Sequence, residues 1–241
     1  MKLKHTHINI SLFSLGCFIL LLGCSTTKQL EFAKEKSNTI SLGAIVKKEG
    51  ALKNNVEIKG VPDLDQKIRV SVIEKEFTKA SFSKYVRIFD TQKPSIEFDD
   101  TTENKPTYFE IELIDDIGYA SSINNDVTSR EYVKNSKKAG VVSKIVMVSK
   151  SAVSFENMTS AFLEEIENQY VVNVYNNEEL LATLSFSEIV VFDYQISFFC
   201  YGKNQRNQVV IMDIVEEGKS CKRPLERKAE KLETIKKLID Y

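Results

Sequence analysis

The chain has 241 residues, of which 42% are hydrophobic and 28% are charged, a composition typical of a globular protein that buries its own core. Its 33 lysine and arginine residues nearly balance its 34 acidic residues. The chain therefore lacks the excess of basic residues that would predict binding to nucleic acid.

The chain begins like a secretory signal. Lys2 and Lys4 precede a mostly apolar stretch over residues 8–22. As a helix this stretch would be roughly 22 Å long, short of the roughly 30 Å that a hydrocarbon core requires. A basic start followed by a short apolar region predicts a signal peptide that is removed. The alternative is an uncleaved anchor helix.

The end of the apolar stretch reads Leu21-Leu22-Gly23-Cys24 and resembles the lipobox of bacterial lipoproteins. The resemblance implies cleavage between Gly23 and Cys24, a diacylglycerol on the Cys24 thiol, and an acyl chain such as palmitate on its new amino group. Two or three such chains hold a protein firmly on a membrane. Ser14-Leu15-Gly16-Cys17 is the alternative, but cleavage there would leave the apolar run at the mature terminus.

Ser25 follows the cysteine and no acidic cluster comes after it. This pattern resembles that of proteobacterial lipoproteins that are sorted to the outer membrane. The resemblance implies that the protein is anchored there and faces the periplasm. Loss of residues 1–23 would remove Lys2 and Lys4, which takes the formal net charge from −1 to −3. It would also remove His5 and His7, the only histidines, and so exclude a histidine-activated nucleophile and any histidine-bound metal. We therefore predict no catalytic residue, no metal and no cofactor.

Residues 24–38 are predicted to form an acylated flexible tether, and residues 39–241 a β-rich globular domain. Segments rich in Val, Ile, Phe and Tyr alternate with polar ones at a period of two, which predicts strands. The predicted strands are residues 39–47, 56–59, 67–77, 85–89, 108–114, 141–153, 170–175, 180–186, 189–199 and 208–215. The expected class is α+β with a mainly antiparallel sheet, as a sandwich or half-barrel.

The strands after residue 170 are expected to follow one another as a meander, with turns at Asn176-Asn177 and at residues 202–207. Apolar residues at helical spacing predict a short helix over residues 159–168. A C-terminal amphipathic helix is predicted from Pro224, which suits a first helical position. Its apolar stripe is Leu225, Ala229, Leu232, Ile235 and Leu238.

The polar stretch over residues 121–140 is predicted to be a long surface loop or a linker between two sub-domains. A loop of that length is often functional, so this stretch is a first candidate for contact with a partner.

Cys200 and Cys221 are the other two cysteines of the mature chain. Outside the cytoplasm, an even pair predicts a disulfide, worth roughly 3 kcal/mol through the entropy of the ring that it closes. Two separately buried thiols are the alternative.

Other residue patterns offer weaker candidates for chemistry. Asp99-Asp100, Asp115-Asp116 and the pair Asp63 and Asp65 could serve as paired carboxylates, although adjacent acids usually mark solvated turns. Ser81-Phe82-Ser83-Lys84 matches Ser-x-x-Lys, a nucleophile motif, but its companion motifs are absent.

Aromatic residues gather near the end of the strand predicted over residues 189–199. Phe192, Tyr194 and Phe198 could line a pocket for a lipid or another apolar ligand, whereas core packing is the commoner reason for such a cluster. The sequence as a whole predicts a non-catalytic, lipid-anchored envelope protein that contacts another envelope protein. Two alternatives stay open: a periplasmic carrier of an apolar ligand, and a histidine-free hydrolase that uses carboxylates.

Overall fold

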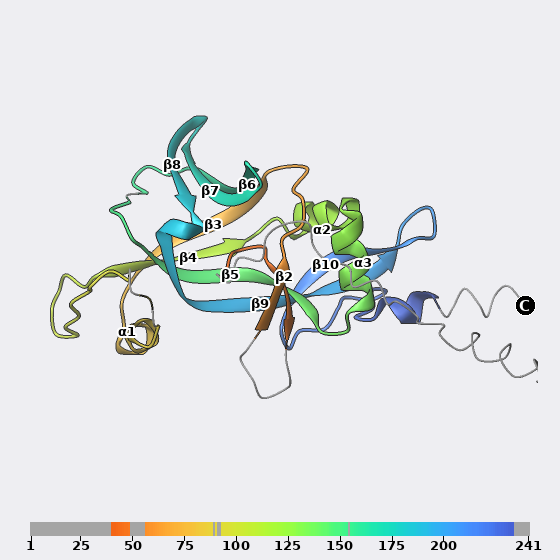
Figure 1. Cartoon of the computed structure of the whole chain (residues 1–241), viewed down its shortest axis with the longest axis horizontal. Helices are drawn as coiled ribbons and strands as arrows, with labels where there is room; N and C mark the ends of the chain where they lie inside the picture. Colours follow the sequence, from red (N-terminus) through yellow and green to blue (C-terminus); the bar gives the residue numbers. More distant parts are fainter. Residues whose placement is uncertain (1–39, 49–55, 89, 91–92, 154, 234–241) are drawn as a thin grey trace, which may run out of the picture. The chain divides into compact units, whose positions relative to one another are not determined.

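The computed structural model describes residues 40–48, 56–88, 90, 93–153 and 155–233. The predicted signal peptide, Cys24 and the predicted tether lie outside these residues. The described residues belong to one compact unit (Figure 1). The strands are β1 (Ile45–Lys48), β2 (Val56–Gly60), β3 (Ile68–Glu76), β4 (Thr107–Leu113), β5 (Ala139–Ser149), β6 (Ser160–Ile166), β7 (Gln169–Asn176), β8 (Glu179–Ser185), β9 (Ile189–Lys203) and β10 (Val209–Glu216). The helices are α1 (Lys79–Val86), α2 (Asp116–Asn125), α3 (Val127–Asn135) and a short 3-10 turn, η1 (Phe186–Glu188).

All the strands join one antiparallel sheet in the order β10-β9-β5-β4-β3-β6-β7-β8, so the predicted β-rich antiparallel class is confirmed. The long strand β5 changes partner along its length. Residues 139–141 pair with β1, and residues 144–147 pair with β4. The β1–β2 hairpin therefore joins the sheet beside the start of β5.

The sheet has to curl, because β8 and β9 are consecutive in the chain but far apart in strand order. Six inter-strand steps separate them, or about 29 Å across a flat sheet. The link between them, η1, has three residues and spans at most about 14 Å. Only a sheet that bends back on itself can satisfy both distances. The result is the half-barrel seen in Figure 1.

Side chains on the inner side of the curl form the main core. Val70, Ile111 and Ile145 are buried there, on β3, β4 and β5. Gly43 lies under two buried tyrosines: the Tyr119 hydroxyl donates to the Gly43 carbonyl, and a Cβ at Gly43 would lie 3.0 Å from Cε2 of Tyr170. The φ of Gly43 is +79°, which favours glycine. This contact attaches the segment before β1 to the core.

A second, smaller core lies on the other face of β5 and β9. It includes Phe77, Tyr85, Tyr108 and Phe192, and α1 covers it. The start of α1 is closed by a capping box between Thr78 and Ser81. At its end, the Lys93 ammonium donates to the carbonyls of Tyr85, Val86 and Ile88 at 3.3, 3.1 and 3.0 Å.

Most predicted strands are confirmed, including those that became β3, β4, β7, β8, β9 and β10. The turns also agree with prediction, since Asn177 and Asn207 have φ of 53° and 59° between paired strands. The strand predicted over residues 85–89 is wrong where the structure describes it, because Tyr85 and Val86 end α1.

The helix predicted over residues 159–168 is also wrong. This segment is β6, which pairs with β3 and β7 and buries Ala161 and Leu163 at a period of two. Glu167 and Asn168 both have positive φ, at 51° and 63°, and form the two-residue turn into β7. The meander is interrupted as well, since β8 does not pair with β9.

The predicted loop over residues 121–140 is wrong in the same way. It contains the second half of α2, all of α3 and the start of β5. The helices are polar because each uses only a few side chains, such as Tyr119, Ile123 and Val133, to reach the core. Since β5 pairs with β4, β1 and β9, the sheet is continuous across this region.

The C-terminal helix is only partly seen. Residues 229–233 are helical, and Ala229 and Leu232 pack against the main core. Pro224 is not a first helical position, because it lies in a turn that precedes a bridge between Glu226 and Tyr201. Residues 234–241 lie outside the described part of the chain.

Candidate functional site

The structure separates the three aromatic residues predicted to line a pocket. Phe192 is 6% exposed and belongs to the second core, with ring centroids 5.7, 5.6 and 5.5 Å from those of Phe77, Tyr85 and Tyr108. These four aromatic rings, in stacked, tilted and edge-to-face contacts, fill this space with side chains.

Tyr194 and Phe198 instead pack against the main core. Asp193 pairs with Val146 and Val191 with Met147, so Phe192 is an extra residue at a β-bulge. The bulge changes which residues share a face, and therefore Phe192 and Tyr194 do not follow simple alternation. Phe198 lies under the Arg227 guanidinium at 4.6 Å. The three aromatic side chains do not line one cavity.

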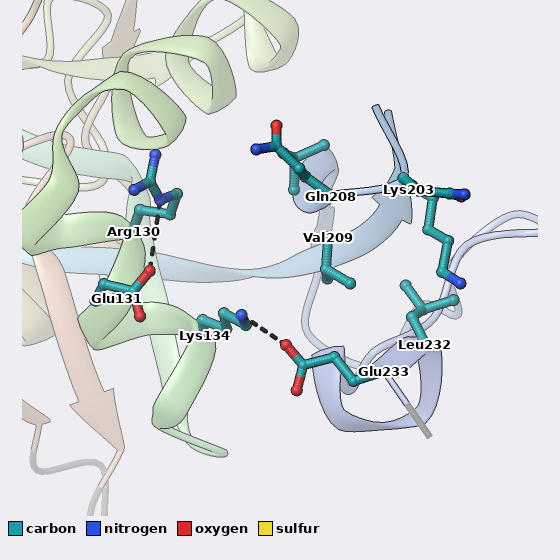
Figure 2. A pocket seen from close by; sticks show the side chains of 10 residues that line it. Arg130, Glu131, Lys134, Lys203, Gln208, Val209, Leu232 and Glu233 are labelled. Carbon is teal, nitrogen blue, oxygen red and sulfur yellow. Dashed lines mark ion pairs between the residues drawn. The ribbon is translucent and has the colours of Figure 1, made fainter. Parts of the chain in front are cut away.

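A cavity of about 360 Å³ lies elsewhere, between α3, the β9–β10 turn and the start of the C-terminal helix (Figure 2). Its walls come from Arg130, Glu131, Lys134, Lys203, Asn207, Gln208, Val209, Val210, Leu232 and Glu233. Lys134 and Glu233 face each other across it and form an ion pair at 2.6 Å (Figure 2).

The cavity is charged at its rim and apolar at Val209 and Leu232. Arg130 is held in place, since its Nη1 donates to the Asn124 carbonyl at 2.8 Å and its Nε lies 3.6 Å from a Glu131 oxygen. Three cationic side chains against two carboxylates could hold a small anion, but the lining has no paired nucleophile and base. No sequence pattern predicts this cavity, because its walls come from three separate segments.

Most acids of the predicted pairs have structural partners. Asp65 accepts from the Ser122 hydroxyl at 2.7 Å and from the Asn125 amide at 2.6 Å, and these bonds lower the pKa of Asp65. The Asp115 carboxylate accepts from the Gly118 N–H at 2.8 Å as the N-cap of α2.

Two further acids and the Ser-x-x-Lys match are occupied in a similar way. Asp99 accepts from the Thr101 N–H at 2.9 Å, and Asp100 pairs with Lys79 at 3.0 Å. The Ser81 hydroxyl serves the capping box of α1, while Lys84 forms an ion pair with Asp193 at 2.5 Å. Each of these side chains holds a turn, a helix end or a surface contact.

Asp116 is the acid whose environment is least favourable. It lies half-buried in the first turn of α2, where α2 contacts β10. Burial raises its pKa to about 6, and the nearby carboxylates of Asp213, Asp115 and Glu112 add to the effect. Among the described aspartate and glutamate residues, Asp116 is the one whose pKa is raised, so its negative charge is the least stabilised.

Replacing Asp116 by asparagine should therefore stabilise the fold at neutral pH. Because the pKa is raised in the folded state, the free energy of unfolding falls as the pH rises from about 4 through about 6. After allowance for solvent screening, Asp116→Asn should raise that free energy by about 1 kcal/mol at pH 8 and leave it nearly unchanged at pH 4. Urea unfolding at the two pH values measures this.

The exposed Glu188 provides a matched control for this test, and Glu188→Gln should leave the free energy of unfolding nearly unchanged. A gain for Asp116→Asn that is equal at both pH values would contradict the assignment, because a neutral Asp116 at low pH already lacks the unfavourable charge.

The disulfide predicted between Cys200 and Cys221 is confirmed, with Cα atoms 5.7 Å apart. Cys200 is fully buried on β9, opposite Asp213 of β10. The chain after β10 reverses near Gly218, whose φ is +87°, and thereby brings Cys221 back to the strand.

Within the residues that the structure describes, no helix combines the length and the apolarity that a membrane span requires. The same residues hold no group of three or more His, Cys, Asp or Glu side chains placed to bind a metal ion. No protein-family model matches the chain, and neither the curated proteins nor the solved structures contain a match to it.

Proposed function

We propose that this chain is a lipid-anchored protein of the bacterial cell envelope whose folded domain acts by contacting another envelope protein. The lipobox-like Leu21-Leu22-Gly23-Cys24 carries the proposal, with Cys24 as the acylated residue. The Cys200–Cys221 bond supports it, since stable disulfides form mainly in oxidising compartments outside the cytoplasm. Ser25 favours the outer membrane, with the domain facing the periplasm.

The roles of the polar side chains support a binding function over a catalytic one. Asp65, Asp99 and Asp115 hold loops and a helix end, and Ser81 caps a helix. A hydrolase that lacks histidine would need carboxylates that face a substrate. Of the acids that the sequence offers for that role, Asp65, Asp99, Asp100 and Asp115 already have internal partners. Asp116 has a raised pKa, but the charged groups that raise it are other carboxylates, so the hydrolase has less support.

The carrier of an apolar ligand is the second candidate, because half-barrels can enclose such ligands. A carrier needs space inside the curl. In the described part of the sheet, inward side chains such as Ile111, Ile145 and Leu163 are fully buried among one another. This filling favours the contact function.

We also propose that the C-terminal amphipathic helix continues past residue 233, with Ile235 and Leu238 on its core face.

The anchor is tested by Cys24→Ser. We expect this variant to lose labelling by a radioactive or clickable fatty acid and to release the domain into the soluble fraction. Cys17→Ser is the matched control and should keep both the label and the membrane association. Continued labelling of Cys24→Ser would move the modified residue to Cys17.

The contact function is tested by crosslinking the mature protein in cells and then recovering it. We expect one envelope protein to be recovered repeatedly with the acylated form, and to be recovered less when Cys24→Ser removes the anchor. Recovery of no protein over several crosslinker lengths, together with lipid that co-purifies in the domain, would favour the carrier.

A further inference from the structure

Strand β8 is an open edge of the sheet. It pairs with β7 on one side, and among the described residues nothing pairs with its other side. An edge strand of this kind presents a row of free N–H and C=O groups to solvent. Leu180 and Leu181 on this strand are 52% and 40% exposed, so apolar side chains accompany the free backbone groups.

The opposite end of the strand order is closed. The Asn124 side chain of α2 donates to the Ile211 carbonyl at 2.7 Å and accepts from the Ile211 N–H at 2.9 Å. These two bonds satisfy both backbone groups of Ile211, within the β10 edge, much as a residue of a neighbouring strand would. No comparable cap lies on β8 in the described part of the chain, and thus the two ends are treated differently.

The chain segment that contains β8 is strongly acidic. Two lysines from outside it lie nearby: the Lys150 ammonium donates to the Ser187 carbonyl at 3.2 Å, and the Lys67 ammonium lies 5.5 Å from the Tyr175 ring centroid. Residues 151–202 contain eight aspartate and glutamate residues and no lysine or arginine. Glu178 and Glu179 stand at the start of β8 and Glu188 just after its end, all three exposed. None of these three forms an ion pair with a described residue, so their charge is available to a partner.

We propose that β8 pairs with an extended, positively charged segment of a partner protein, which adds a strand to this edge of the sheet. The inference rests on the proposed contact function and names its surface. Backbone hydrogen bonds to β8 would supply affinity, Leu180 and Leu181 would accept apolar side chains, and lysine or arginine would face Glu178 and Glu179. The bulge at Leu181 leaves residues 182–185 in regular register for this pairing.

A second copy of this chain fits the edge less well. Two β8 strands side by side would bring two acidic chain segments together, and like charges across an interface disfavour association. A strand that carries lysine or arginine would instead attract the acidic side chains of this segment.

The test uses the full chain, purified from membranes in a mild detergent, and an eight-residue peptide of alternating lysine and valine. We expect the peptide to slow amide hydrogen exchange at residues 179–185 at least tenfold at saturation. A peptide with N-methyl groups on every second residue cannot complete the backbone pairing and should bind at least tenfold more weakly. An alternating glutamate and valine peptide should not bind.

Charge reversal at the edge provides the matched variants. Glu179→Lys should weaken the lysine peptide about tenfold, whereas Glu103→Lys, an exposed acid on the loop before β4, should leave its affinity unchanged. Equal binding of the N-methylated peptide, or protection outside residues 179–185, would overturn the proposal. Protection of these residues that appears without peptide and grows with protein concentration would assign the edge to a second copy.

The cellular experiment separates this inference from the contact function itself. A photocrosslinker at Leu181 should capture the envelope protein that the general crosslinker recovers, and one at the exposed Ile117 of α2 should not. Capture of that protein from Ile117 alone would overturn the β8 assignment and leave the contact function standing.

Discussion

Replacing Phe192 by alanine is expected to lower the free energy of unfolding by about 4 kcal/mol. The Phe192 ring is almost fully buried against Phe77, Tyr85 and Tyr108, so its removal leaves a cavity that rigid neighbours cannot fill. The loss combines the transfer free energy of the ring with the cost of that cavity. Urea or guanidinium unfolding of the purified domain measures it.

Phe198 offers a matched control on the same strand. It is only partly buried and lies under Arg227, so Phe198→Ala should cost about 1 kcal/mol. A pocket wall behaves differently from a core residue, because a ligand-free pocket already has space beside its side chains. A Phe192→Ala variant as stable as Phe198→Ala would contradict the core assignment and restore the ligand pocket as an explanation for the aromatic cluster.

Removing the disulfide should have an effect of similar size. Cys200 and Cys221 are 21 residues apart in the sequence, and closing a ring of that length restricts the unfolded chain by about 3 kcal/mol. We expect the double variant Cys200→Ala and Cys221→Ala to lose about that much stability to urea. Reduction of the unaltered protein by dithiothreitol should lower its stability by a comparable amount.

The single variant Cys221→Ala separates the bond from the packing of Cys200. It keeps the buried Cys200 side chain in place but cannot form the bond, so its loss should nearly equal that of the double variant. A titration of free thiols in denaturant without reductant provides the direct check. Two reactive thiols at these positions in protein isolated from cells without reductant would show that the bond does not form in the native protein.

Several elements could be predicted from the sequence because their signal is local. In β3, buried Ile68, Val70 and Val72 alternate with more exposed neighbours, and the same pattern recurs in β4. Asn177 supplied a turn signal of its own, since asparagine adopts positive φ more readily than most residues. The cysteine pair needed only an even count and an oxidising destination.

Other elements could not be predicted from the sequence, because their residue patterns fit two kinds of secondary structure equally well. Phe162, Leu163 and Ile166 suit a helix as well as a strand, and the turn after β6 uses Glu167 where glycine would have marked it. The helices α2 and α3 read as a polar loop. Each is short, and its buried residues include a serine, Ser122 or Ser129, which gives no hydrophobic signal. The stability of each helix therefore comes from packing against the core and not from its own sequence.

The sequence by itself determined where most strands lie, which cysteines pair and how unevenly the charge is spread, and it predicts the anchor at Cys24. Only the tertiary structure decided the strand order, the bulge that places Phe192 in the second core, the cavity beside Lys134, and the contrast between the capped β10 and the open β8. The physical reason is distance along the chain. Alternating hydrophobicity and turn residues report on neighbours in the sequence. Strand pairing and core packing join segments that are far apart in the chain, and neither segment's sequence identifies its partner.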